Sequence, residues 1–310
     1  MNEQFYKLFN EKNAFQRYFA RRFLFDIFQR LGFHITGNHF YDLVPDTRFM
    51  AEHYKDEPRS LTGIDWQFAE SEVLAARLLD DHGTEYKLER GRFGFTEDNY
   101  YYYGLESLML FAMLRKIKPA KMIEIGQGSS TRVALAALAL NARENGSKCE
   151  FVSIDPYPRL TQKFAPEGVN LRLLTQELQS VDLNPLLENC NFIFVDSSHV
   201  YKYGSDVQHE FTQLYPLLRP GTLVHVHDIF SPYEYPLASA VQRKQFWNEQ
   251  YFLENFLAFN HAFEVCLPLN LLIRQSVLLR EGVRALSLET DFKYTGSSFY
   301  FQRKQTYKTY

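Results

Sequence analysis

From Tyr101 onward, short continuous runs of hydrophobic residues alternate with longer segments of helical character. Five such runs predict buried strands: Met122–Gly126, Phe151–Asp155, Leu171–Thr175, Phe192–Asp196 and Thr222–Asp228. Four segments around them predict helices: Leu105–Ile117, Ser130–Asn141, Leu183–Leu187 and Ser205–Leu218. Apolar strands that are each followed by a helix are typical of a parallel sheet with both faces covered.

The pattern changes after the fifth strand. Phe246–Phe259 predicts a long helix, Phe263–Leu267 a sixth strand and Ser298–Arg303 a seventh strand of alternating character. We therefore expect an α/β fold, a doubly wound Rossmann-like sheet of seven strands in which the last strand is antiparallel.

Residues 1–100 lack this alternation, and Ala69–Asp80 is their clearest helical segment. Leu24, Ile27, Phe28 and Leu31 share one helical face, which predicts a helix docked on the body or on a second subunit. The alternative is a membrane-surface helix with Arg17, Arg21, Arg22 and Arg30 facing lipid. We expect residues 1–100 to be a mainly helical extension, a lid or an oligomer contact, and residues 101–310 to be the domain that carries the chemistry.

Composition narrows the class of protein. The 310 residues are 45% hydrophobic and 23% charged, which is typical of a packed globular protein. A net charge of −3 provides no basic field for nucleic acid. The longest apolar run, Val133–Leu140, is too short to span a bilayer. The three cysteines argue against a disulfide framework, and no export signal is evident. We expect a cytoplasmic protein with neither nucleic acid nor membrane as a partner.

The first predicted strand leads into a glycine turn, Glu124-Ile-Gly126-Gln-Gly128-Ser-Ser-Thr131, and then a helix. Glycines at such a turn let the backbone approach a ligand, and a helix N-terminus favours anionic groups. The alternative is a tight turn in which Ser129 or Ser130 caps the helix. Thr131 stands where a dinucleotide fingerprint requires Gly or Ala.

Acidic residues end the second, fourth and fifth predicted strands. Asp155 follows Gly128 by 27 residues and is placed to accept both hydroxyls of a ribose. Asp196, with His199 three residues later, and Asp228 end neighbouring strands, where burial and nearby charge shift pKa values. A capping or loop role is the alternative for each acid alone. His225 is read most simply as a core histidine.

Taken in order, these motifs resemble those of class I S-adenosylmethionine-dependent methyltransferases, and the closest group is a bacterial branch related to macrocin-type O-methyltransferases. The residues that carry the resemblance are the glycine turn, Asp155, the segment Asp196-Ser-Ser-His199-Val-Tyr201 and His227-Asp228. They span roughly residues 101–303.

The resemblance implies a role for each of these positions. Glu124, Gly126 and Gly128 would hold the methionine end of S-adenosylmethionine, and Ser130 or Thr131 would cap the helix beside its carboxylate. Asp155 would bind the ribose, and Asp196 would lie under the sulfonium and the amino group. Glu106 would reach the same amino group, with a solvated helix face as its alternative.

The catalytic residues that we expect are His199 and Asp228. An acceptor hydroxyl must lose its proton, and His199 is the candidate base because imidazole titrates near neutrality. A structural histidine that bonds a loop carbonyl is its alternative. Metal-dependent relatives bind Mg²⁺ through acids that here are Asp196 and Asp228. Because His227 departs from their acid-rich pattern, we expect no metal, with Mg²⁺ held by Asp196 and Asp228 as the alternative.

The sequence therefore predicts a methyltransferase that acts on the oxygen of a small molecule or sugar. Two alternatives remain open: a nucleotide-dependent oxidoreductase, and a catalytically silent protein that binds the cofactor. Neither the identity of the acceptor nor assembly into a homo-oligomer is specified by the residues.

Overall fold

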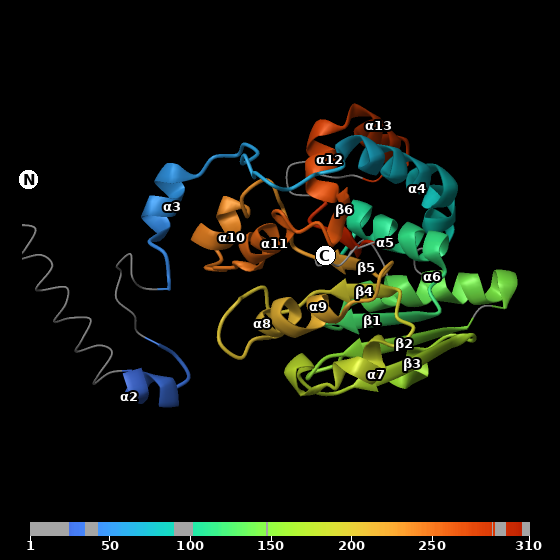
Figure 1. The fold of residues 1–310 in the computed structure, drawn as a ribbon, viewed down its shortest axis with the longest axis horizontal. Coiled ribbons are helices and arrows are strands. Elements are labelled where there is room, and N and C mark those ends of the chain that lie inside the picture. Colours follow the sequence, from blue (N-terminus) through green and yellow to red (C-terminus); the bar gives the residue numbers. More distant parts are fainter. Residues whose placement is uncertain are drawn as a thin grey trace, which may run out of the picture. The chain divides into compact units, whose positions relative to one another are not determined.

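The computed structural model describes residues 25–34, 43–89, 102–146, 148–286, 288 and 296–305 (Figure 1). The chain divides into two compact units. One contains the described residues up to Lys55 together with Pro236–Phe246, and includes the helices α2 (Phe25–Arg30), α3 (Thr47–His53) and α10 (Leu237–Val241). The other contains Asp56–Tyr235 and the chain from Trp247 onward, and it holds the sheet.

Seven strands form one sheet, in the order β3-β2-β1-β4-β5-β7-β6. Their bounds are β1 Lys121–Ile125, β2 Cys149–Ile154, β3 Val169–Leu174, β4 Phe192–Val195, β5 Leu223–Val226, β6 Phe263–Pro268 and β7 Phe299–Arg303. The first five strands run parallel, and β7 is antiparallel to both β5 and β6. The predicted doubly wound sheet with an antiparallel last strand is confirmed.

The register of the parallel strands brings the predicted site residues to one edge of the sheet. Ile125 pairs with Ile154 on one side and with Val195 on the other, and Val195 pairs with Val226. Strands β1, β2, β4 and β5 therefore end level with one another. The residues that follow them emerge side by side, where ligands bind in open α/β sheets.

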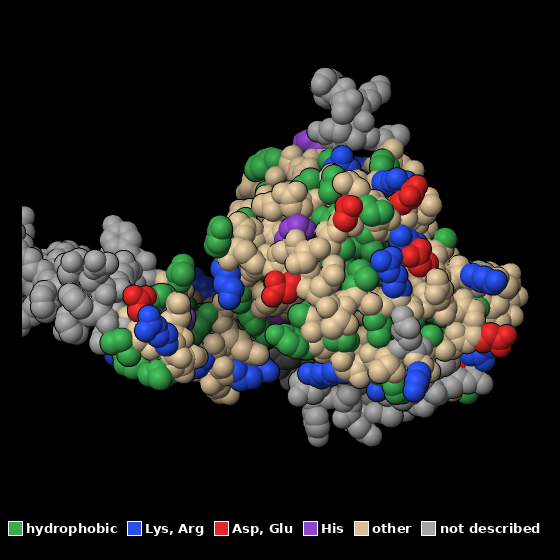
Figure 2. All heavy atoms as spheres, turned by 90° about the horizontal axis from the view of Figure 1, so that it is seen from below, with side chains coloured by type: hydrophobic (Ala, Val, Ile, Leu, Met, Phe, Trp, Pro, Cys, Tyr) green, Lys and Arg blue, Asp and Glu red, His purple; other side chains and the backbone are tan. Residues whose placement is uncertain are grey.

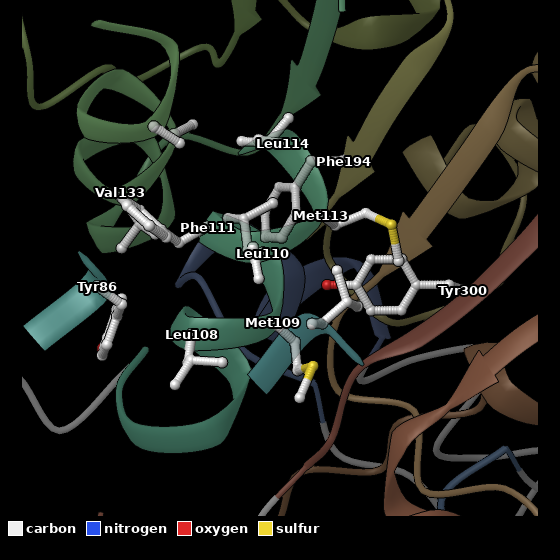
Figure 3. Close-up of a cluster of buried hydrophobic side chains, with 14 of the residues drawn as sticks. Tyr86, Leu108, Met109, Leu110, Phe111, Met113, Leu114, Val133, Phe194 and Tyr300 are labelled. Carbon is white, nitrogen blue, oxygen red and sulfur yellow. The ribbon is translucent and has the colours of Figure 1, made fainter. Parts of the chain in front are cut away.

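Helices cover both faces of the sheet. One face carries α4 (Phe68–Glu89), α5 (Gly104–Ile117), α6 (Ser129–Asn145), α12 (Leu269–Gln275) and α13 (Val277–Ala285). The other face carries α7 (Leu183–Leu187), the helical segment 206–217 and α11 (Glu249–Leu257). Side chains of β4 alternate between the two cores: Phe192 and Phe194 join the first, while Ile193 and Val195 join the second. Figure 3 shows Phe194 and Tyr300 beside the buried residues of α5.

Several helices differ from the sequence-based predictions. Helix α4 continues past Asp80 to Glu89, through Gly83. Gly83 packs against the side chain of Leu286, whose Cδ1 would lie 2.6 Å from a Cβ at this position. The predicted helix Ser205–Leu218 consists of α8 (Asp206–His209), a π-helical turn (Glu210–Leu214) and α9 (Tyr215–Leu217). Helix α11 is shorter than predicted, and α12 and α13 were not predicted.

Helix α4 packs on α5, α13 and β6, all in the unit that holds the sheet. Residues 56–89 therefore belong to the compact unit that holds the sheet, and the roles predicted for residues 1–100 stay predictions. Helix α2 has no buried residue. Leu24 and three of the arginines behind the membrane-surface alternative, Arg17, Arg21 and Arg22, lie outside the described residues.

On the face that Figure 2 displays, acidic and basic side chains are interspersed. No helix among the described residues is long and apolar enough to cross a membrane. Cys149, Cys190 and Cys266 are all free, as predicted.

Candidate active site

A cleft of about 410 Å³ opens where β1, β2 and β4 end. Its lining includes Gly126, Asp155 and Asp196, the residues that directly follow these three strands, together with Lys202 and Asp206 from the segment after β4. The volume lies within the range of sites for small molecules and cofactors. The glycine turn and two of the predicted strand-end acids thus meet at one cavity.

Both the backbone conformation and the close packing at position 126 require glycine. Its φ of +83° lies in the left-handed region, and a Cβ at this position would lie 2.0 Å from the carbonyl oxygen of Asp196. Gly128 is different, because a Cβ there would meet no heavy atom within 4 Å. The first glycine therefore lets the turn close over the end of β4, while the second leaves open space at the N-cap of α6.

Asp155 joins the glycine turn to the end of β2. Its Oδ2 accepts the backbone N–H of Gln127 at 2.8 Å, and its Oδ1 accepts that of Tyr157 at 2.6 Å. Each carboxylate oxygen has a second lone pair, and the residue lines the cleft. Asp155 can therefore shape the turn and still accept a ligand hydroxyl.

Glu124 lies beneath the turn and is fully buried. Its carboxyl group accepts hydrogen bonds from the hydroxyls of Ser153 (2.7 Å), Thr131 (2.9 Å) and Ser130 (3.1 Å). Burial raises the pKa of Glu124 to about 8, and the three hydroxyls oppose this rise only partly. Thr131 also accepts the N–H of Gly128 at 3.1 Å, as a helix-capping residue does. Glu124, Ser130 and Thr131 are not among the residues that line the cleft.

We predict that Glu124→Gln changes how stability depends on pH. The carboxyl group has a pKa of about 8 when folded and a model value of 4.5, so its stabilising contribution is complete below 4.5 and is lost as pH rises through 8. The neutral amide has no such loss. Relative to wild type, the free energy of unfolding of the variant should rise by a few kcal/mol between pH 5 and pH 9, at about 1.4 kcal/mol per pKa unit. Urea unfolding of both proteins measures this difference, and an identical difference at both pH values would contradict it.

His199 is held from two sides. Its φ is +59°, a conformation that costs a non-glycine residue about 1–3 kcal/mol. Its carbonyl oxygen accepts the N–H groups of Asn248 (3.0 Å) and Glu249 (3.2 Å) at the start of α11. Its ring Nδ1 lies 2.8 Å from Oε2 of Glu249, which is completely buried. Because an ionised carboxylate only accepts hydrogen bonds, Glu249 places the ring hydrogen on Nδ1.

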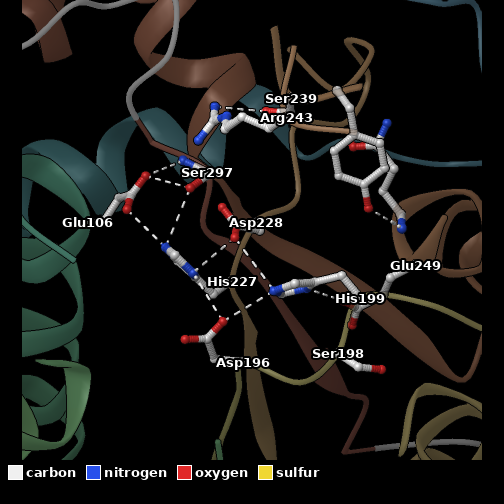
Figure 4. A network of polar contacts seen from close by, with 12 residues as sticks. Glu106, Asp196, Ser198, His199, His227, Asp228, Ser239, Arg243, Glu249 and Ser297 are labelled. Carbon is white, nitrogen blue, oxygen red and sulfur yellow. Dashed lines mark hydrogen bonds and ion pairs between the residues drawn. The ribbon is translucent and has the colours of Figure 1, made fainter. Parts of the chain in front are cut away.

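The second ring nitrogen of His199 faces two acids. Nε2 lies 3.4 Å from Oδ1 of Asp196 and 3.5 Å from Oδ2 of Asp228 (Figure 4). Burial opposes the charged form of the ring, but Asp196, Glu249 and Asp228 outweigh it and hold the pKa of His199 well above its ordinary value. Asp228 also has a positive φ, +56°. Two strained residues thus meet at the same point.

His227 and Glu106 complete the cluster. Nε2 of His227 lies 3.0 Å from Oε2 of Glu106, whose Oε1 accepts the N–H and the O–H of Ser297, both at 2.6 Å. Nδ1 of His227 lies 3.4 Å from Oδ1 of Asp196. Glu106 was predicted to reach the cofactor, but the structure turns its carboxylate towards His227. It does not line the cleft.

Asp196 belongs to both the cleft and the cluster. Burial alone would raise its pKa, but His227 and His199 hold the pKa well below the ordinary value. The pKa of Asp228 is instead raised, because burial outweighs the attraction of the two histidines. One ligand-capable atom from each of Asp196, His227 and Asp228 lies within 4.8 Å of the other two. The structure therefore brings together the two acids predicted as the alternative metal ligands and adds His227 to them.

His225 takes no part in this cluster. It is fully buried, stacked on Tyr300 with ring centroids 4.0 Å apart and edge-on to Phe194 at 4.7 Å. Burial holds the pKa of His225 well below its ordinary value. Such a neutral, buried ring agrees with its interpretation as a core histidine.

Two residues that organise the site were not found by sequence reasoning. Glu249 lies 50 positions after His199 and Ser297 lies 191 positions after Glu106, so only the folded chain brings these pairs together. An acid in the first turn of a helix is common on electrostatic grounds alone. Nothing in the sequence around Glu249 therefore distinguishes it from an ordinary helix start.

The segment that carries the motifs also resembles a known protein family. Residues 123–229, from β1 to just after Asp228, match a family described as a methyltransferase domain. No curated protein matches the sequence significantly. Structures with a similar fold include the SAH-bound methyltransferase PaMTH1 of Podospora anserina, with 12% identity, 79% of this chain and 99% of that chain covered, and a TM-score of 0.36. They also include the SAH-bound plantazolicin methyltransferase BpumL, with 10% identity, coverage of 77% and 98%, and a TM-score of 0.39.

Structural similarity with so low an identity and TM-score carries no argument about function. The functional class therefore depends on the segment that matches the family model. That segment contains the glycine turn, Asp155, Asp196, His199 and Asp228. Together with the sheet order, this match supports the predicted methyltransferase domain within residues 123–229. The relation to the macrocin-type branch stays a resemblance of motifs.

Proposed function

We propose that this methyltransferase transfers a methyl group from S-adenosylmethionine to a hydroxyl oxygen of a small molecule or sugar, with His199 as the general base. The observation that carries the proposal is the position of His199. Its Nδ1 is fixed by buried Glu249, and its Nε2 lies 3.4 Å from Asp196, which also lines the cleft.

The cleft suits the cofactor in shape and chemistry. Gly126 has no side chain and lies close to the backbone of Asp196, where the methionine end of the cofactor would lie. The open space at Gly128 adjoins the N-terminus of α6. Asp155 would accept the ribose hydroxyls, and Asp196 would face the sulfonium and the amino group; both line the cleft. Glu124, Ser130 and Thr131 would support the turn from below, and Glu106 would act through His227.

The cofactor, when bound, supplies a methyl carbon that is activated by its sulfonium leaving group. The contribution of the protein is then mainly alignment, since near-attack geometry supplies much of the rate in displacements of this kind. The cleft residues hold one reactant, and the acceptor hydroxyl must lie within hydrogen-bonding distance of His199 Nε2.

Glu249 and the two aspartates equip His199 for proton transfer. The hydrogen on Nδ1 leaves Nε2 as the nitrogen that accepts the proton of the hydroxyl. The imidazolium that forms is stabilised by Asp196, Asp228 and Glu249. A sulfonium bound beside Asp196 would offset part of this negative charge and bring the pKa of His199 closer to neutrality. The predicted catalytic role of Asp228 is thus electrostatic.

Turnover with hydroxyl-bearing acceptors tests the proposal. Purified protein with S-adenosylmethionine should release S-adenosylhomocysteine in the presence of small phenols, sugars or hydroxylated metabolites, and the product should carry an O-methyl group by mass spectrometry. For each active acceptor, the analogue that already carries a methyl group on that oxygen is the matched control and should be inert. Methylation confined to nitrogen or carbon acceptors would contradict the proposal.

Asp155→Ala should weaken cofactor binding. Loss of a hydrogen bond to a charged group costs about 1.5–3 kcal/mol, so the Kd for S-adenosylhomocysteine should rise about 10- to 150-fold by calorimetry. Asp182→Ala is a matched control, because Asp182 also accepts a backbone N–H but does not line the cleft. Equal affinity in Asp155→Ala and wild type would remove Asp155 from the cofactor site.

The roles predicted for residues 1–100, an acceptor lid or an oligomer contact, stay proposals. Within this range, α4 contributes buried Ala75, Leu78, Leu79 and Tyr86 to the core beside α5. A lid or an oligomer contact would therefore be formed by the residues that precede α4.

A further inference from the structure

Three acceptor atoms converge where β4 and β5 end. They are Oδ1 of Asp196, Oδ2 of Asp228 and Nδ1 of His227, and the nitrogen lies 3.4 Å and 3.7 Å from the two oxygens (Figure 4). Ligand-capable atoms of these three side chains all lie within 4.8 Å of one another. Nε2 of His199 approaches the same two carboxylate oxygens, at 3.4 Å and 3.5 Å.

Glu106 decides which nitrogen of His227 carries the hydrogen. Both oxygens of its carboxylate are engaged, Oε1 by the N–H and O–H of Ser297 and Oε2 by Nε2 of His227 at 3.0 Å. A carboxylate that already accepts two hydrogen bonds accepts the third as well, so Nε2 of His227 carries its hydrogen. Burial opposes the charged form of the ring, but Asp228, Asp196 and Glu106 outweigh it and hold the pKa of His227 well above its ordinary value. A metal ion at Nδ1 would therefore take the place of a proton.

The spacing of these atoms favours a cation over a proton among them. A proton on Nδ1 would make hydrogen bonds of 3.4–3.7 Å, longer than the 2.7–3.2 Å usual for N–H···O. A metal ion about 2.0–2.2 Å from each ligand places neighbouring ligand atoms about 3.0–3.5 Å apart. The two carboxylates would balance the charge of a divalent ion.

The donor set does not fit the magnesium ion that the resemblance implies. Mg²⁺ takes oxygen ligands in near-ideal octahedra, and it rarely accepts imidazole nitrogen. One histidine with two carboxylates suits divalent ions of the first transition row. A ligating histidine usually donates its other N–H to a carboxylate, as His227 does to Glu106.

We propose that Asp196, His227 and Asp228 bind a divalent first-row transition-metal ion in preference to Mg²⁺, with Glu106 as the residue that positions His227. Nε2 of His199 lies 3.4 Å and 3.5 Å from the same two oxygens. The ligand set leaves His199 out because the proposed function uses this nitrogen as the base. Metal binding itself does not depend on the acceptor and does not require that methyl transfer be observed.

Metal titration of tag-free, chelator-stripped protein tests the inference. Calorimetry with Zn²⁺, Co²⁺ and Mg²⁺ should give one site per chain for Zn²⁺ and Co²⁺, and binding of Mg²⁺ should be at least about 100-fold weaker. Co²⁺ should show visible d–d absorption that changes on binding. Equal affinity for Mg²⁺, or no binding of any of the three ions to folded wild-type protein, would overturn the inference.

Variants test which side chains bind the metal ion and which only position a ligand. His227→Ala and Asp228→Asn, each checked for folding by circular dichroism, should both lose the site. Glu106→Gln should lower the affinity for Zn²⁺ about 10- to 100-fold, which is typical when a residue that hydrogen-bonds to a metal ligand is lost. His199→Ala is the matched control, which should keep one metal ion per chain while its turnover falls. Loss of the metal in His199→Ala, or retention in His227→Ala, would overturn the ligand set. The first result would also count against His199 as the base, whereas the second would leave the proposed methyl transfer unaffected.

Discussion

His199→Ala should lower kcat by about 10²- to 10⁴-fold, the range typical for loss of a general base. The affinity for S-adenosylhomocysteine should change little, because His199 is not among the residues that line the cleft. The effect should therefore appear in kcat and not in cofactor binding. Steady-state kinetics with an active acceptor, combined with calorimetry of the variant, separates these two quantities.

A histidine elsewhere on the same sheet unit provides the control for this substitution. His261 is exposed and precedes β6, and His261→Ala should leave turnover unchanged. Full activity of His199→Ala would show that another group accepts the proton. A parallel loss of cofactor affinity would instead show that His199 shapes the cleft.

Gly126→Ala should destabilise the protein by about 4 kcal/mol or more and abolish cofactor binding, which is an exceptional effect for one methyl group. The φ of +83° is unfavourable for alanine, and the added Cβ would overlap the carbonyl oxygen of Asp196 at 2.0 Å. Because that oxygen belongs to the backbone, only movement of the turn or of the segment after β4 can relieve the overlap. Urea unfolding measures the loss.

Gly146→Ala isolates the backbone part of this effect. Gly146 has a φ of +67° at the end of α6, but a Cβ there would meet no heavy atom within 4 Å. Its substitution should cost only about 1–2 kcal/mol, the penalty for a left-handed alanine, and should spare cofactor binding. A similar loss of unfolding free energy in the two variants would show that the contact between Gly126 and the backbone of Asp196 leaves room for a Cβ.

Strands β1, β4 and β5 could be predicted from the sequence because each is an apolar run buried on both faces. The runs at Phe151 and Phe192 each end in an acid that the register then places at one edge of the sheet. Asp155 and Asp196 could be predicted as site residues for this reason, since they directly follow strands whose positions the pattern determines.

The rest of the site depends on contacts between distant parts of the chain. Glu249 and Ser297 acquire their roles only when α11 and the segment before β7 come to lie beside His199 and Glu106. The direction of the Glu106 side chain is set by Ser297 and His227, and a helical pattern alone could not show it. The contact of Gly83 with Leu286 likewise joins residues far apart in the sequence, and the helical pattern alone could not show it.

The central claim is that the cleft between Gly126, Asp155 and Asp196 binds S-adenosylmethionine and not a dinucleotide. Calorimetry of the wild-type protein with S-adenosylhomocysteine and with NAD tests this most directly, since both ligands carry the ribose that Asp155 would bind. The account predicts one binding site per chain for S-adenosylhomocysteine and no detectable heat from NAD. Binding of NAD without binding of S-adenosylhomocysteine would contradict it.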